Sequence, residues 1–241
     1  MRVIFILAIF LFTTYCIAQT VEPSASVESE TLQIELESQY SIEKDAGQKI
    51  TSWSLPSALI RYGVLNKAEF QFSIPVTRQQ VFNRDKLVET YHEIGDMQVG
   101  MAVDLWKQHK LIPEASLMAR AIVPVAQNDV SAGVGKILSL NLMNLLTERL
   151  SFNYNVGFLQ DIDLSSSGFY IINFTYELNQ KFHFFVEQFG DFTMDDFLSH
   201  SFNIGFGSNL VDNLSVDFSF ANGLDYKMNY VGVILTWIVR T

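Results

Sequence analysis

The chain has 241 residues, of which 49% are hydrophobic and 17% are charged, and its formal net charge is −10. An acidic chain presents the wrong charge to a polyanion, so we expect no nucleic-acid partner. After the N-terminal segment, no apolar stretch reaches the roughly 20 residues that a membrane-spanning helix needs. The mean hydropathy is nevertheless +0.17, so the fold must keep a large apolar surface away from water by other means.

Residues 1–18 have the composition of a secretory signal peptide. Arg2 supplies the positive charge, residues 3–12 form the apolar core, and a small-residue cleavage site precedes Gln19. The alternatives are a lipoprotein with the lipid on Cys16 and an uncleaved signal anchor. Cleavage would remove the only cysteine and with it all thiol chemistry. Residues 19–30 are polar and acidic, which predicts a disordered leader, with a plug inside a barrel as the alternative.

Residues 94–105 show the pattern that recurs along the rest of the chain. The apolar side chains of Met97, Val99 and Met101 alternate with polar or small residues. Successive side chains of a strand point to opposite faces, so this segment has one apolar face and one polar face. A helix would scatter the same residues around its whole circumference.

The alternation predicts twelve strands. They cover residues 31–42, 50–62, 68–76, 94–106, 111–124, 136–143, 150–160, 169–178, 182–189, 200–208, 214–220 and 229–239. Pro56 predicts a bulge in the second strand, because proline cannot donate a hydrogen bond to a neighbouring strand. The odd-numbered connections, including a polar loop at 77–93, are longer than the even-numbered ones. Short turns at one end and longer loops at the other are typical of an up-and-down barrel in an outer membrane.

The two faces decide between a soluble and a membrane protein. Alternation alone would also fit a soluble sandwich or a lipocalin-like barrel with its apolar face inside. Tilted strands of about ten residues match the hydrocarbon thickness of a bilayer, and aromatic residues such as Trp106, Tyr154 and Trp237 gather toward strand ends, as in an interfacial girdle. We therefore predict an all-β fold: an antiparallel up-and-down transmembrane β-barrel of about 12 strands over residues 31–241, in the outer membrane of a Gram-negative-type cell.

Several short motifs resemble those of one family. They are Pro56 with Arg61-Tyr62-Gly63, Glu69, Ile74-Pro75, Gly95-Asp96 with Gly100, Pro124, and Asp217 with Asn222-Gly223-Leu224 and Gly232. Over nearly all of the mature chain they resemble the outer-membrane transporter family named after the MetA pathway of phenol degradation. The resemblance implies a channel for small, often aromatic or hydrophobic compounds. The chain departs from the family pattern at Val125-Ala126, where Thr-Gly is expected, and at Thr241, where an aromatic residue is common in the signal read by the barrel-assembly machinery.

Charged residues on the polar faces are the candidate lumen and selectivity residues. They are Glu35, Glu37, Arg61, Glu69, Asp96, Asp104, Glu114, Arg120, Glu177, Glu187 and Asp217. Acidic residues outnumber the two arginines, so a conducting lumen would prefer cations. Arg61 and Glu69 flank a tight turn symmetrically, and we expect them to pair across a hairpin, either fixing the register of the strands or contributing to selectivity. The alternative is a narrow lumen closed by its own side chains.

Two function classes remain open: a passive channel or transporter for small solutes, and a structural or surface-interacting barrel with a closed lumen. A lipid hydrolase is a third reading, because His200 and Ser201 superficially resemble a nucleophile motif, but adjacent strand residues point to opposite faces and cannot cooperate. We therefore predict no enzymatic activity, no cofactor and no metal. The expected partners are outer-membrane lipid, the barrel-assembly machinery and a small-molecule solute, and the sequence leaves the oligomeric state open.

Overall fold

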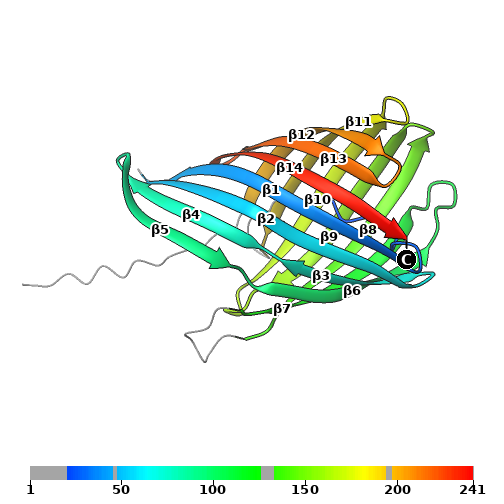
Figure 1. The fold of residues 1–241 in the computed structure, drawn as a ribbon, viewed down its shortest axis with the longest axis horizontal. Coiled ribbons are helices and arrows are strands. Elements are labelled where there is room, and N and C mark those ends of the chain that lie inside the picture. The colour runs from blue at the N-terminus through cyan, green and yellow to red at the C-terminus, as the bar shows by residue number, and fades with distance from the viewer. Residues whose placement is uncertain (1–20, 46–47, 126–132, 194–196, 241) are drawn as a thin grey trace, which may run out of the picture.

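The computed structural model describes residues 21–45, 48–125, 133–193 and 197–240, which form β-strands joined mostly by short connections (Figure 1). The strands are β1 (Thr31–Asp45), β2 (Gln48–Leu65), β3 (Ala68–Ile74), β4 (Val76–Asn83), β5 (Lys86–Ile94), β6 (Met97–Trp106), β7 (Glu114–Val123), β8 (Gly135–Thr147), β9 (Leu150–Gln160), β10 (Ser166–Glu177), β11 (Phe182–Phe192), β12 (Phe197–Val211), β13 (Leu214–Gly223) and β14 (Lys227–Arg240). None of the described residues forms a helix that is long and apolar enough to cross a membrane. The predicted signal peptide lies outside the described residues.

The strands form one antiparallel sheet that closes into a twelve-stranded barrel, because two of the twelve strands are each divided into two labelled segments. Segments β3 and β4 together form one strand of the barrel, interrupted at Pro75. Segments β5 and β6 together form the strand beside it. Strand β2 pairs with β3 along one half and with β4 along the other. Strand β1 pairs with both β2 and β14 and so closes the sheet. The prediction of a barrel of about 12 strands is confirmed.

Residues 77–93, predicted to be a polar loop, instead belong to the hairpin of β4 and β5, which extends the wall at one end (Figure 1). Arg84 and Asp85 make the turn with φ values of 47° and 64°, a conformation that Asn or Gly more often supplies. Within the described residues, β5 pairs with β4 and with no other strand. The alternation of apolar and polar residues did not predict this hairpin, because neither face of the hairpin has to be continuously apolar.

The prediction that every odd-numbered connection is longer than every even-numbered one is also wrong. Strand β1 continues to Asp45 and β2 begins at Gln48, so that most of the first predicted loop is strand. The connection between Val123 and Gly135 remains long. We name the end that carries this connection and the β4–β5 turn the outer rim, and the end where β1 begins and β14 ends the inner rim (Figure 1).

The register of β1 and β2 shifts at the position predicted from Pro56. Glu37 pairs with Ser57 and Gln39 with Ser54, so one residue of β1 faces two of β2. This bulge is confirmed, and its cause is the missing N–H group of the proline.

Most apolar side chains point out of the barrel and most polar side chains point into it, but Ile171, Phe189, Ala221, Met228 and Tyr230 form a buried apolar cluster on the inward faces of β10, β11, β13 and β14. On β10, Phe174 is 40% exposed whereas the adjacent Asn173 is 3% exposed. The buried polar residues include Gln71, Ser116, Asn141, Asn155, Glu187 and Asn203, whereas Met101, Leu117, Val156, Phe184 and Phe218 are exposed. A soluble protein does not expose an apolar surface of this extent, so the predicted arrangement, with the apolar face on the outside of the barrel, is confirmed.

Candidate functional site in the barrel lumen

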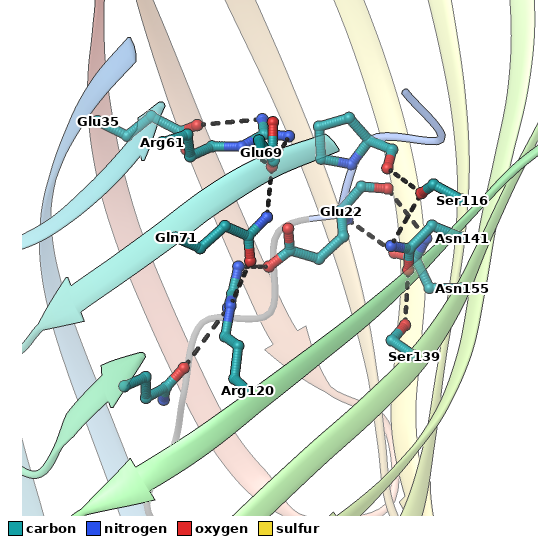
Figure 2. Close-up of polar contacts among 12 residues, drawn as sticks. Glu22, Glu35, Arg61, Glu69, Gln71, Ser116, Arg120, Ser139, Asn141 and Asn155 are labelled. Carbon is teal, nitrogen blue, oxygen red and sulfur yellow. Dashed lines mark hydrogen bonds and ion pairs between the residues drawn. The ribbon is translucent and has the colours of Figure 1, made fainter. Parts of the chain in front are cut away.

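Residues 21–30 run through the lumen, contrary to the expectation of a disordered leader. The backbone N–H of Glu22 donates to Oδ1 of Asn155 at 2.7 Å, and Nδ2 of Asn155 donates to the carbonyl oxygen of Glu22 at 3.0 Å (Figure 2). A buried backbone needs hydrogen-bond partners, and this segment finds them on wall side chains. The amide of Asn155 thus replaces the neighbouring strand that a β-ladder would supply.

Two carboxylates of the wall bind the next turn of this segment. The N–H of Ser26 donates to Oδ1 of Asp104 at 2.6 Å, and the N–H of Val27 donates to Oε2 of Glu69 at 2.6 Å. Hydrogen bonds to charged acceptors are roughly twice as strong as neutral ones. Ser24, whose hydroxyl donates to Glu114 at 3.1 Å, is 5% exposed. The segment is therefore bound at several consecutive residues.

The segment reaches the wall of the barrel at Gly63 of β2. The N–H of Glu30 donates to the carbonyl oxygen of Gly63 at 2.9 Å, and Ser29 forms a parallel bridge with Gly63. A Cβ atom at position 63 would overlap the carbonyl oxygen of Glu28 and lie 2.6 Å from its carbonyl carbon. Glycine is therefore required at this position for the two backbones to approach each other closely.

A charged network crosses the lumen beside this segment (Figure 2). Nη2 of Arg61 lies 2.7 Å from Oε1 of Glu69, and its Nη1 lies 3.6 Å from Glu35. Arg61 is 3% exposed and Glu69 is 0% exposed, so each charge depends on the other for compensation. The predicted pairing of Arg61 and Glu69 across the hairpin is confirmed.

Gln71 links this ion pair to a second one. Its Nε2 donates to Glu69 at 2.5 Å, and its Oε1 accepts from Nε of Arg120 at 2.7 Å. Nη2 of Arg120 lies 2.7 Å from Glu22 of the lumen segment. A continuous chain of hydrogen bonds and ion pairs thus connects β1 and β2, through β3, to β7 and to residues 21–30.

Serine and asparagine side chains, together with Glu187, line the lumen on β7, β8 and β10 to β12. Ser139 donates to Asn141 at 2.6 Å, and Ser116 donates to the carbonyl oxygen of Pro23 at 3.1 Å. On the neighbouring strands, Glu187 accepts hydrogen bonds from Asn173 at 3.2 Å and from Asn203 at 3.4 Å. The lumen therefore offers donors and acceptors on β7, β8 and β10 to β12, next to the buried apolar cluster.

The structure gathers only part of the predicted set of lumen residues. Glu35, Arg61, Glu69, Asp104, Glu114, Arg120 and Glu187 lie in the network or against residues 21–30. Four lie elsewhere. Glu37 faces the lumen beyond Glu35, Asp96 accepts from the N–H of Val125 at 3.4 Å, Glu177 is exposed at the inner rim, and Asp217 bonds His183 at 2.7 Å.

Sequence reasoning missed three residues that organise the site: Glu22, Gln71 and Asn155. Gln71 and Asn155 lie at polar positions of strands in which apolar and polar residues alternate. This pattern predicts that both side chains face inward, but it does not predict their partners. Glu22 lies in a segment whose composition indicates disorder. Only the alternative of a lumen plug pointed toward its role.

His200 and Ser201 have separate partners on opposite faces of β12. The hydroxyl of Tyr170 and Nδ1 of His200 are 2.7 Å apart, whereas Oγ of Ser201 lies 2.9 Å from the hydroxyl of Tyr226. Ser201 is 1% exposed. This geometry does not bring a base to the serine. Across the described residues, no group of three or more His, Cys, Asp or Glu side chains could hold a metal ion.

Comparisons with known proteins agree on the architecture. The model of the family described as "Putative MetA-pathway of phenol degradation" matches residues 19–229. The chain is similar to a COG4313 outer membrane channel from Pseudomonas putida F1, with a TM-score of 0.73 and 10% identity over 91% of this chain and 100% of that chain. No curated protein matches this chain.

Two other solved barrels are less similar. The KdgM porin in complex with disordered oligogalacturonate has a TM-score of 0.55 and 10% identity over 85% of this chain and 98% of that chain. The translocator domain of the autotransporter NalP from Neisseria meningitidis has a TM-score of 0.52 and 11% identity over 88% of this chain and 89% of that chain. At such low identity the likeness shows the fold alone, which is that of an outer-membrane β-barrel.

Proposed function

Since the chain belongs to the MetA-pathway family of phenol degradation, we propose that it is an outer-membrane channel through which small solutes, including aromatic compounds of the size of phenol, pass without an energy source. The observation that carries this proposal is the largely polar lining of the barrel, where buried Asn, Ser and Gln side chains accompany charged ones. A small solute with a hydroxyl group can exchange hydrogen bonds with these side chains as it leaves water.

The charges of the lumen support a preference for cations. Its carboxylates are Glu22, Glu35, Glu37, Glu69, Asp104, Glu114 and Glu187, and its cations are Arg61 and Arg120. A ring of carboxylates favours cations in a water-filled pore. Lys107 at the inner rim approaches Asp104 and Glu114, but it is 65% exposed, so it offsets them only weakly.

The position of residues 21–30 supports a second candidate function, a barrel whose lumen is closed. The segment crosses from Asn155 on β9 to Gly63 on β2 and contacts β3, β6 and β7 on the way. A channel would have to release the segment, or pass solutes around it. A structural barrel would retain it permanently.

Planar bilayers separate the two functions. We expect the purified protein to conduct, with a reversal potential in a tenfold KCl gradient shifted toward the potassium equilibrium potential. Catechol, added on one side, should interrupt the current if aromatic solutes enter the lumen. A correctly folded protein that never conducts would favour the closed barrel, and anion selectivity would refute the charge argument.

A further inference from the structure

Three lysines lie side by side on the outward face of the barrel at the outer rim. Lys44 on β1 pairs with Lys227 on β14 and with Lys49 on β2. Directly opposed residues of an antiparallel sheet share a face with Cβ atoms about 5 Å apart, and like charges there are destabilising. Within the part of the chain that the structure describes, none of the three forms an ion pair with an acidic side chain. Such a row is unexpected in a chain with a net charge of −10.

The height of the row follows from the outward face of β1. Leu32, Ile34 and Leu36 begin this face at the inner rim, and Lys44 ends it twelve residues after Leu32. At a rise of about 3.3 Å per residue and a tilt of about 40°, Lys44 lies about 30 Å above Leu32. The apolar band of an outer-membrane barrel is about 25 Å tall. The lysines therefore lie just beyond the hydrocarbon, at the level of the headgroups.

An aromatic pair marks the boundary below the lysines. Tyr40 and Trp53 face each other across β1 and β2, with ring centroids 4.3 Å apart. Tyr and Trp of membrane barrels concentrate where the hydrocarbon meets the headgroups. The order from the inner rim upward is thus apolar residues, aromatic pair, lysine row.

Two features of the neighbouring strand β4 extend the row. On β4, Arg78 lies opposite Trp53, hence on the outward face, and its Nε is buried with no hydrogen-bond partner within the described residues. Lys49 lies over the ring of Phe82, 5.0 Å from its centroid. Four cations of β14, β1, β2 and β4 therefore share one outward surface. We call Lys44, Lys49, Arg78 and Lys227 the cationic surface.

A pocket of about 480 Å³ opens beside Lys44 and Lys227. Its lining includes Ile42, Asn222, Asp225 and Asn229 together with the two lysines. The carboxylate of Asp225 accepts from the backbone N–H of His200 at 2.9 Å, so part of its charge is already satisfied. The pocket thus combines two cations, amide groups, one carboxylate and the aliphatic side chain of Ile42.

We propose that the cationic surface binds the phosphorylated headgroup of a lipid in the outer leaflet. The acyl chains of such a lipid would lie against the apolar band. Its phosphate would compensate the positive charges of the opposed lysines and accept a hydrogen bond from Arg78. The proposal depends on the orientation of the barrel in the membrane and not on whether its lumen conducts.

The test uses the full-length protein in detergent micelles and a bis-phosphorylated disaccharide lipid of the lipid A type. Binding of this lipid is measured for the wild type and for the triple variant K44Q/K49Q/K227Q. Each lysine near a charged headgroup contributes roughly fivefold to affinity, so we expect binding to weaken about 100-fold. The matched control K67Q/K110Q/K181Q removes three exposed lysines of the inner-rim turns and should bind as the wild type does.

Two competitors identify the recognised chemistry. The same lipid after removal of its phosphates should bind as weakly as the triple variant binds the intact lipid. Inorganic phosphate at equal phosphorus concentration should not displace the lipid, and displacement would overturn the assignment to a lipid. Equal affinity of the wild type and the triple variant, both shown to be folded by their heat-dependent gel mobility, would overturn the proposal itself. A failure to conduct in bilayers has no bearing on these outcomes.

Discussion

The substitution Glu69→Gln tests how residues 21–30 are held in the lumen. Three donor groups converge on Oε1 of Glu69: Nε of Arg61 at 2.8 Å, Nη2 of Arg61 at 2.7 Å and Nε2 of Gln71 at 2.5 Å. The oxygen of a glutamine at position 69 would stay on that side. Its NH2 group would then face the N–H of Val27, which now donates to Oε2 at 2.6 Å. Two donors would oppose each other, and the segment would lose this bond.

The expected magnitude follows from the type of bond that is lost. A hydrogen bond to a charged acceptor contributes about 1.5 to 3 kcal/mol, and every 1.4 kcal/mol is tenfold in an equilibrium constant. If residues 21–30 leave the wall as a unit, the detached population should increase about 10- to 100-fold. Glu35 lies 3.6 Å from Arg61 and keeps partial compensation of its charge, so the barrel itself should remain folded.

Maleimide labelling of a cysteine at position 24 measures this population. Ser24 is 5% exposed in the lumen, so S24C should react only when the segment detaches. The background carries C16S to remove the native thiol. We expect S24C/E69Q to label about 10- to 100-fold faster than S24C, while S24C/E177Q, which neutralises an exposed carboxylate of the inner rim, labels at the rate of S24C. Equal rates for E69Q and its parent would refute the role of Glu69 in holding the segment.

Three further substitutions test other parts of the account. G63A should also accelerate labelling of S24C, because its Cβ would overlap the carbonyl oxygen of Glu28, whereas G232A, whose Cβ would meet the rotatable hydroxyl of Ser219 at 2.9 Å, should not. R61M should lower the free energy of unfolding in urea by about 3 to 5 kcal/mol, since it leaves Glu69 buried without its partner. The double variant R61M/E69M should recover part of this loss. A loss in the double variant as large as the sum of the losses in R61M and E69M would contradict the pairing. E114Q should reduce the cation preference measured from reversal potentials, whereas the control E148Q, in a turn at the inner rim, should leave it unchanged. An unchanged preference in E114Q would show that Glu114 does not face the ion path.

The alternation of the strands was sufficient to predict the barrel because lipid and water impose opposite demands on its two faces. Phe174 and Asn173 are adjacent, yet Phe174 points out of the barrel and Asn173 points into the lumen, and the alternation in the sequence reflects this difference. The same reasoning failed for β4 and β5, because strand residues beyond the hydrocarbon meet water or polar headgroups and need not alternate. The Arg84-Asp85 turn carries no glycine, so turn chemistry did not reveal the hairpin either.

The lumen site was predictable only in part, because its partners are distant in sequence. The pairing of Arg61 with Glu69 could be read from a local hairpin. Glu22 and Asn155, in contrast, are 133 positions apart, and their contact depends on the closure of the whole barrel. A short polar segment buries little apolar surface, so composition indicates disorder; its order comes from side chains that only the folded wall brings together.

The single-channel conductance of E69Q/D104N, compared with that of the wild type, tests most directly whether residues 21–30 control a water-filled lumen. Both substitutions replace a charged acceptor of the backbone N–H groups of Ser26 and Val27 by a neutral amide. We predict that the variant spends a much larger fraction of time in a state of higher conductance. Identical traces from two proteins that are equally well folded would contradict a lumen controlled by this segment.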